Sequence, residues 1–274
     1  MKIKILATVV AALVISASSA LADITIFSDN FDGYADQAAF NAVWNVSLAP
    51  AGVGGTLTTE LAYSPSQSIK SPGTATAYQA GHDITPVWGT AGQPLVWSFE
   101  FYDSTQAANL RQFGHLRDNS PTLAQVVAMG AYNDVTATKD RHTGLSVTAT
   151  DLNTYYAVRV AFSPGPNWFI LNGPGAVTRS TGWHEMKAVF KDTTVEFFVD
   201  GVNGLSDLTT SYASTAGAIT FDRVLVGSGL SSANGAAYYD NVMVQVIPEP
   251  SSVALCLLGG FGLAAGVVLR RRKV

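Results

Sequence analysis

Residues 183–201 read WHEMKAVFKDTTVEFFVDG, and this stretch contains two short runs in which apolar and polar side chains alternate. The positions on the apolar side are His184, Met186, Ala188 and Phe190 in the first run, and Val195, Phe197 and Val199 in the second. Successive side chains of a β-strand point to opposite faces, so each run predicts a strand that buries one face. The loop at 191–193 is short enough for a hairpin, and Asp200-Gly201 supplies the next turn.

The same pattern continues on both sides of this hairpin. Short runs rich in β-branched and aromatic residues, separated by Gly, Pro, Asn and Asp, predict strands at 24–27, 56–61, 95–103, 110–117, 125–132, 144–150, 155–162, 168–171, 183–190, 194–200, 221–227 and 237–246. Only residues 36–43 favour a helix, with Asp36 as its N-cap. We predict an all-β, two-sheet antiparallel jelly-roll sandwich over residues 23–246, without repeats or a second domain.

Charge and cysteine content exclude several functions. Six of the 16 Lys and Arg residues lie in the two terminal segments, so residues 23–250 hold 10 basic residues against all 20 acidic ones, a net charge of −10. Phosphate contacts need clustered Lys and Arg, so no nucleic-acid partner is expected. Cys256 is the only cysteine and lies in the apolar C-terminal segment, which excludes an intrachain disulfide and a Cys-ligated zinc site.

Residues 1–22 have the pattern of a secretory signal peptide. Lys2 and Lys4 precede an apolar run at 5–15, and Ala20-Leu21-Ala22 places small residues at the predicted cleavage site. An uncleaved membrane anchor is the alternative, but the apolar run is about half of the ~20 residues that a span needs. We therefore predict that the mature chain begins at Asp23.

The C-terminal segment 247–274 has three parts. Pro248-Glu249-Pro250 is followed by an uncharged run at 253–269 and then by Arg270, Arg271, Arg272 and Lys273. At ~1.5 Å per residue the run is about 25 Å long, a short but workable transmembrane helix. Basic residues stay on the cytoplasmic side, so the domain before the helix should face outward.

These three parts, in this order, resemble the PEP-CTERM sorting signal of exported bacterial proteins. The resemblance implies that an exosortase-type membrane transpeptidase recognises this segment and cuts near Pro248-Glu249-Pro250. It also implies anchoring in the inner membrane before processing, and then a place on the surface or in the extracellular matrix of a Gram-negative bacterium that forms biofilms. A plain single-span anchor is the alternative.

The central hairpin resembles that of concanavalin A-like and laminin-G-like jelly rolls. Residues 238–244, YYDNVMV, resemble the closing strand of that superfamily, and Asp29-Asn30-Phe31-Asp32 its opening. The resemblance implies the fold for most of residues 29–246. It does not imply one function, because many functions use this scaffold.

No catalytic pattern is found. Glycoside hydrolases of this fold use two carboxylates on one face of a strand, but Glu100 and Asp103 are three apart and so point to opposite faces. Glu185 and Glu196 lie on the two strands of the hairpin and are expected to be solvated. The four histidines lack the spacing of metal ligands. We expect no enzymatic activity.

Candidate sugar-binding residues gather on two predicted strands and their neighbours. They are Arg111, His115 and Arg117 on one face of 110–117, Tyr155 and Arg159 on one face of 155–162, and the aromatic residues Tyr132 and Trp168. If these strands share a sheet, they supply guanidinium donors and aromatic planes for a neutral or acidic polysaccharide. The alternative is that each aromatic ring belongs to the core and each arginine to the general surface. Trp44, Trp97 and Trp183 are assigned to the core.

Asp29, Asp32 and Asp240 form a candidate calcium site. Asp29 and Asp32 lie in the oxygen-rich loop 28–32, and Asp240 lies in the predicted last strand. The first and last strands of jelly rolls commonly run side by side, which would bring these residues together. We predict at most one structural calcium ion there, the alternative being that the three residues only shape turns.

The sequence therefore predicts an exported, non-catalytic module that binds extracellular polysaccharide. One alternative is a structural surface or biofilm protein that acts through protein contacts, and a second is a divergent polysaccharide hydrolase or lyase. A binding module should present an arginine or aromatic face, a structural protein a featureless acidic surface, and an enzyme converging carboxylates with a raised pKa.

Overall fold

The computed structural model describes residues 23–45, 54–73, 79–90, 92–104, 110–118, 125–161, 167–191, 194–205, 220–228 and 235–248. The strands are β1 (Ile24–Asp29), β2 (Thr56–Thr58), β3 (Ser68–Ser71), β4 (Ala80–Val87), β5 (Leu95–Asp103), β6 (Gln112–Asp118), β7 (Gln125–Ala131), β8 (Thr138–Lys139), β9 (Ala157–Ala161), β10 (Asn167–Ile170), β11 (Gly182–Lys191), β12 (Thr194–Val199), β13 (Val202–Leu205), β14 (Phe221–Val226) and β15 (Ala237–Val246). Two short helices, α2 (Gln37–Val43) and α3 (Ala149–Thr154), complete the described structure.

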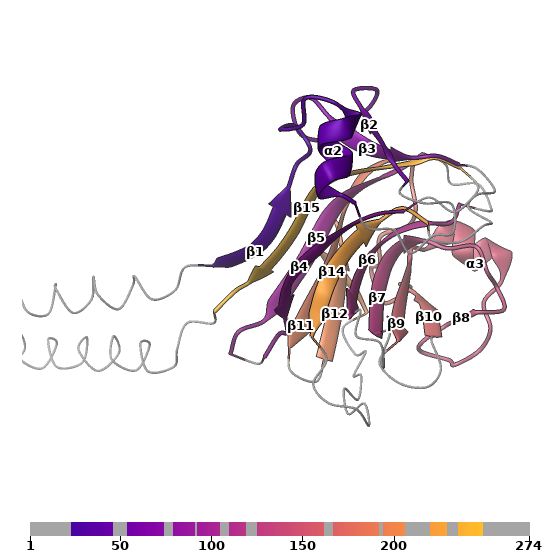
Figure 1. Ribbon diagram of the computed structural model, residues 1–274. Helices are drawn as coiled ribbons and strands as arrows, with labels where there is room; N and C mark the ends of the chain where they lie inside the picture. Colours follow the sequence, from indigo (N-terminus) through magenta and orange to yellow (C-terminus); the bar gives the residue numbers. More distant parts are fainter. Residues whose placement is uncertain are drawn as a thin grey trace, which may run out of the picture.

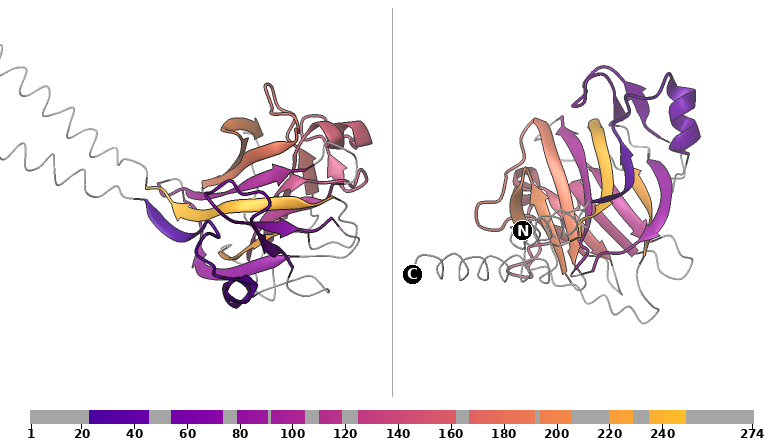
Figure 2. Two further views of the ribbon diagram at one scale, coloured as in Figure 1. Left: turned by 90° about the horizontal axis from the view of Figure 1, so that it is seen from above. Right: turned by 90° about the vertical axis from the view of Figure 1, so that its left-hand side faces the viewer.

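The strands form two sheets that pack face to face (Figures 1 and 2). Sheet A has eight strands, in the order β13-β12-β11-β5-β15-β3-β2 with β1 also paired to β15, and sheet B has seven, in the order β4-β14-β6-β7-β9-β10-β8. Every pairing is antiparallel except the short one between β8 and β10. The predicted all-β sandwich is confirmed.

The hairpin at 183–201 lies between the edge strand β13 and the long strand β5 of sheet A. β11 pairs with β12, with Lys191 opposite Thr194, and its other edge pairs with β5 over nine residues from Gly182–Asp103 to Phe190–Leu95. The alternating side chains that the sequence assigned to the buried face, from His184 to Phe190 and from Val195 to Val199, are buried. Burial of one face fixes the strand register, because a slip by one residue would turn these side chains to solvent.

The main core is a large cluster between the sheets, and two smaller buried clusters are separate from it. Its largest fully buried side chains are aromatic, among them Trp44, Trp97, Phe99 and Phe197. Gly114 of β6 faces β5, and a Cβ atom there would lie 2.6 Å from the Phe99 ring. The sheets therefore approach each other closely at this point because β6 carries no side chain there.

The sequence predicted helix α2 but not helix α3. α2 begins after Asp36, whose side chain accepts a hydrogen bond from the Ala39 N–H, as the N-cap prediction requires. The strand predicted at 144–150 is wrong. Thr148 and Asp151 form a reciprocal capping box there, which satisfies free backbone donors and starts α3 instead. β3, β4, β8 and β13 were not predicted, because they are short or carry weak alternation.

The two ends of the sandwich domain lie side by side (Figure 1). β1 pairs with β15, and Ile24 is opposite Val246. The predicted signal peptide at 1–22 and the predicted transmembrane helix at 253–269 lie outside the described residues. In the part of the chain that is described, no helix is both long and apolar enough to cross a membrane.

Candidate functional site

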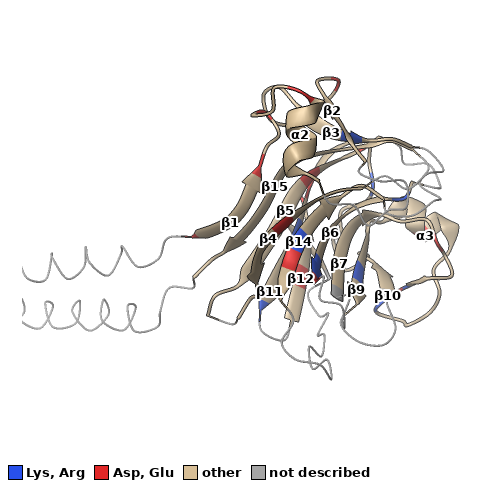
Figure 3. Ribbon diagram, in the orientation of Figure 1, with Lys and Arg blue, Asp and Glu red and all other residues tan. Residues whose placement is uncertain are grey.

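The outer face of sheet B, which points away from the core, carries a group of arginines. The pairing of β6 with β14 places Arg117 opposite Arg223, and the pairing of β9 with β10 places Arg159 opposite Trp168. Figure 3 shows basic positions on β14, β6 and β9, in the middle of this sheet. We call Arg117, Arg159 and Arg223 the arginine cluster.

The arginine cluster is only partly neutralised. Arg223 donates to the Asp83 carboxylate at 2.5 Å, whereas Arg117 and Arg159 have no ion-pair partner among the described residues, and the Nε atom of each is buried without a hydrogen bond there. Burial lowers the pKa of both guanidinium groups, and the charges of Arg159 and Arg223 lower that of Arg117 further. Arginine nevertheless stays charged in proteins, so two cations are held here at an energetic cost.

His115 lies beside this cluster and is only 5% exposed. Its Nε2 atom is 3.3 Å from the Gln79 amide nitrogen. Burial, together with the charges of Arg117 and Arg159, holds the pKa of His115 well below its usual range. His115 is therefore neutral at pH 7 and adds a polar group without adding charge.

The predicted aromatic residues are arranged as a buried stack next to the cluster. The rings of Tyr132 and Trp168 are parallel with centroids 3.8 Å apart, and they are 5% and 4% exposed. Arg111 lies over the Tyr132 ring at 4.5 Å and donates to its hydroxyl at 2.7 Å. These rings bind one another and Arg111, so neither offers an open plane to a sugar; the stack instead supports the neighbouring polar face.

Six of the seven predicted residues thus share the outer face of sheet B. Tyr155 does not join them: it follows α3 and packs with Val147, Leu152 and Ile170. Sequence reasoning missed Arg223, because only the register of β14 against β6 shows that it lies beside Arg117. The assignment of this face to sugar binding stays a prediction.

The three predicted calcium ligands act as hydrogen-bond acceptors, at the end of β1, in the loop after it and at the bulge of β15. Asp32 Oδ1 accepts from both the N–H and the hydroxyl of Ser66, and Asp240 accepts from the N–H groups of Tyr63 and Ser64. Asp29 accepts from Phe31 N–H and from the Trp44 indole, each at 2.8 Å. Within the described ranges no three His, Cys, Asp or Glu side chains gather to hold a metal ion. The calcium site stays a prediction.

Sheet A carries a row of carboxylates on its own outer face. Glu100 of β5 lies opposite Glu185 of β11 on one side and Asp240 of β15 on the other. Burial raises the pKa of Glu100 to about 7, and the charges of Glu185, Asp200 and Asp240 contribute to the increase. Sequence reasoning rejected Glu100 with Asp103, and Glu185 with Glu196, as catalytic pairs. It did not bring Glu100 and Glu185 together, because their proximity depends on the register of β5 and β11.

Trp183 lies next to this carboxylate row. Its assignment to the core is wrong: it is half-buried on the outer face, where its ring makes edge contacts with Tyr102 and Tyr63. The reason is parity, because His184 takes the buried face of β11 and Trp183, its neighbour, must take the other. Sheet A therefore combines exposed aromatic rings with converging carboxylates.

Comparison with known proteins supports the sorting signal and the fold. A family model described as the PEP-CTERM protein-sorting motif matches residues 246–273. The chain therefore carries this motif, which marks it as an exported protein held in a membrane until an exosortase processes it. No curated protein matches the chain.

Three of the solved structures with a similar fold compare with this chain as follows. A carbohydrate esterase from the Shiga toxin-encoding bacteriophage phi24B is 16% identical, with a TM-score of 0.52 over 82% of this chain and 100% of its own. The cellulose-induced protein Cip1 is 17% identical, with a TM-score of 0.50 over 80% and 96%. The globular domain of T. cruzi calreticulin is 11% identical, with a TM-score of 0.52 over 91% and 100%. At these identities the likeness concerns the fold alone.

Proposed function

We propose that this exported protein is a non-catalytic module that binds an acidic polysaccharide of the cell envelope across the outer face of sheet B. The observation that carries the proposal is the pair Arg117 and Arg159, two partly buried cations without a carboxylate partner among the described residues. Partly buried charges that lower the stability of the fold, and that have no neutralising partner among the described residues, are typical of ligand-binding sites.

The chemistry of the arginine cluster indicates which class of ligand it binds. Guanidinium groups bind carboxylates through two parallel hydrogen bonds, and they do so more strongly when water is partly excluded. Neighbouring strands lie about 4.8 Å apart, so the arginines of β14, β6 and β9 are spread over roughly 15 Å of the face. Such spacing suits the repeated carboxylates of a polyuronate better than a single small anion.

The first test measures binding of the full-length protein, kept in a zwitterionic detergent, to polygalacturonate and to neutral dextran. We expect saturable binding of polygalacturonate that weakens with salt, and no binding of dextran at this face. Arg117→Met and Arg159→Met should each weaken binding about 10–100-fold, the effect of losing a charged hydrogen bond. Arg141→Met, which removes an arginine that lies over Phe169 and away from the cluster, is the matched control.

A stability measurement separates a binding role from a structural one. If Arg117 and Arg159 serve a ligand, each Met variant should keep or raise the melting temperature of the free protein, because a buried uncompensated charge is removed while the apolar stem remains. A fall in melting temperature in both variants with unchanged polygalacturonate binding would favour the structural surface protein that acts through protein contacts.

A second candidate function rests on the carboxylate row of sheet A. Glu100 has a pKa of about 7 and lies opposite Glu185, the arrangement of a proton-holding acid beside an ionised carboxylate that retaining glycosidases use. A groove of about 400 Å³ on the same face reaches Glu185. Release of reducing ends from a polysaccharide panel, abolished in both Glu100→Gln and Glu185→Gln, would support a hydrolase; no release by the parent protein would exclude these substrates.

A further inference from the structure

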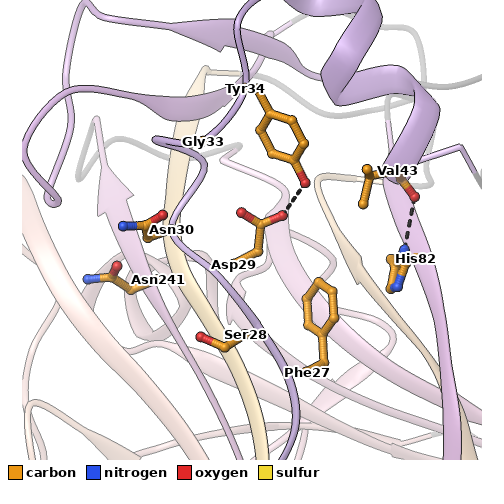
Figure 4. A pocket seen from close by; sticks show the side chains of 9 residues that line it. All are labelled: Phe27, Ser28, Asp29, Asn30, Gly33, Tyr34, Val43, His82 and Asn241. Atoms are coloured by element: carbon orange, nitrogen blue, oxygen red, sulfur yellow. Dashed lines mark hydrogen bonds between the residues drawn. The ribbon is translucent and has the colours of Figure 1, made fainter.

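A pocket of about 760 Å³ lies where β1, α2 and β4 meet the bulge of β15, and no member of the arginine cluster lines it (Figure 4). Its size falls within the usual range of small-molecule sites. Phe27 and Tyr34 give it apolar surface, and Asp29, His82 and Asn241 give it polar groups. None of these residues takes part in the polysaccharide binding proposed for sheet B.

Backbone irregularities from two strands converge on this pocket. The pairing of β1 with β15 shifts between Thr25 and Phe27, and the pairing of β15 with β5 shifts between Asp240 and Met243. Phe31 and Asn241 have φ values of 62° and 45°, and they are two of the three non-glycine residues with positive φ in the described part of the chain. Bulges and left-handed residues cost energy and gather where a side chain must be re-aimed toward a site.

Asp29 is held in place with acceptor capacity to spare. Its carboxylate accepts from the Phe31 N–H, from the Trp44 indole and from the Tyr34 hydroxyl. A carboxylate has about four acceptor positions, so one remains for a ligand. Burial, and then the hydrogen bond to Asp29, raise the pKa of Tyr34, which therefore keeps its proton and remains a donor to Asp29.

His82 presents an acceptor on the opposite wall of the pocket (Figure 4). Its Nδ1 atom is 2.9 Å from the carbonyl oxygen of Val43. A carbonyl only accepts, so Nδ1 carries the proton, and Nε2 of the neutral ring has a lone pair. None of the described residues bonds to Nε2. The ring stacks on Phe27 at 4.7 Å, which fixes its orientation.

Asn241 adds to the pocket a side-chain amide, which can both donate and accept hydrogen bonds. Its backbone N–H is bound to Asp240, but no described residue bonds to its side chain, which lies across the pocket from His82 (Figure 4). The lining contains no lysine or arginine. An anionic ligand would meet the Asp29 carboxylate without a compensating cation, so the pocket disfavours phosphates and uronates.

We propose that this pocket binds one neutral sugar unit of a glycan. Asp29 and His82 Nε2 accept hydrogen bonds from sugar hydroxyls, the Asn241 amide donates and accepts, and the Phe27 and Tyr34 rings cover the apolar face of the sugar. The pocket shares no lining residue with the arginine cluster, so the proposed site for a neutral sugar is separate from the proposed site for an acidic polysaccharide.

The test titrates the full-length protein, in a zwitterionic detergent without a sugar headgroup, with glucose, galactose, mannose and N-acetylglucosamine, and with glucuronate as the anionic probe. We expect at least one neutral sugar to bind with a millimolar Kd. His82→Asn keeps a donor near Val43 but removes Nε2, and Asn241→Gly keeps the positive φ but removes the amide. Each should weaken binding at least about tenfold.

His142→Asn, the same substitution on an exposed turn, and Arg117→Met should leave neutral-sugar binding unchanged. The proposal is overturned if the folded parent binds none of the four neutral sugars, or if binding survives both pocket variants. Binding of glucuronate alone, sensitive to Arg117→Met, would support the arginine cluster and overturn the sugar pocket, so the two proposals fail separately.

Discussion

Glu100 is a carboxyl group whose ionisation is opposed by its surroundings. Burial and the charges of Glu185, Asp200 and Asp240 raise its pKa to about 7 from a usual value near 4.5. An acid with a raised folded-state pKa binds its proton more tightly when folded, so its ionisation costs stability as pH rises through 7, and this cost disappears as pH falls below 4.5.

We therefore predict that Glu100→Gln stabilises the protein at pH 8 by about 1–2 kcal/mol, a figure reduced from the full shift for solvent screening. At pH 4 the variant and the parent should unfold at the same denaturant concentration. Chemical denaturation at both pH values measures this. The control is Glu196→Gln, which removes an exposed partner of Lys191 and should change stability little at either pH. Equal effects at pH 4 and pH 8 would contradict the assignment.

Strand β6 and strand β5 touch across the core because residue 114 is glycine. A methyl group there would lie 2.6 Å from the Phe99 ring and 3.1 Å from that of Trp97. We predict that Gly114→Ala lowers the free energy of unfolding by about 1–3 kcal/mol, which corresponds to a few degrees in melting temperature. Gly92→Ala is the control, since a Cβ there meets no atom within 4 Å. Equal melting temperatures for the two variants would show that the sheets can move apart freely.

The candidate calcium ligands lie at the end of β1, in the loop after it and within β15. Hydrogen-bond donors already occupy acceptor positions of Asp29, Asp32 and Asp240, and the hydrogen bonds of Ser66 to Asp32 lower the pKa of that carboxyl. If Asp29, Asp32 and Asp240 hold a calcium ion, the ion must share or displace these donors, and it should raise the melting temperature by more than about 2 °C relative to EDTA. Calorimetry in both conditions measures this, and equal melting temperatures would exclude the metal site.

The whole domain should unfold in one step. One core cluster joins the inner faces of both sheets, from Phe31 near the first strand to Val246 at the end of the last. We predict that tryptophan fluorescence and far-ultraviolet circular dichroism report the same transition, because neither sheet can keep its buried face without the other. Separate transitions would mean that sheets A and B are independent units.

The position of the domain ends is also a property of the whole molecule. The pairing of Ile24 with Val246 brings the start and the end of the sandwich to the same side. The PEP-CTERM motif begins at residue 246, so the domain is connected to its sorting signal at the end where β1 and β15 meet. The arginine cluster on sheet B and the pocket beside α2 belong to the same rigid sandwich.

The sequence alone predicted the features that depend on near neighbours in the chain. Alternation with a period of two located β11 and β12 and their buried faces, Asp36 marked the start of α2, and the order of Pro248-Glu249-Pro250, apolar run and basic end identified the sorting signal. It also placed Arg111, His115 and Arg117 on one face of a strand, because parity is a local property.

Which strands are neighbours, and in which register, could be seen only in the folded chain. The pairing of β6 with β14 brought Arg223 to Arg117, and the pairing of β5 with β11 brought Glu100 to Glu185. The stacking of Tyr132 on Trp168 depends on the order of β7, β9 and β10 in sheet B. Partners far apart in the chain are selected by the packing of the whole core, which no local pattern contains.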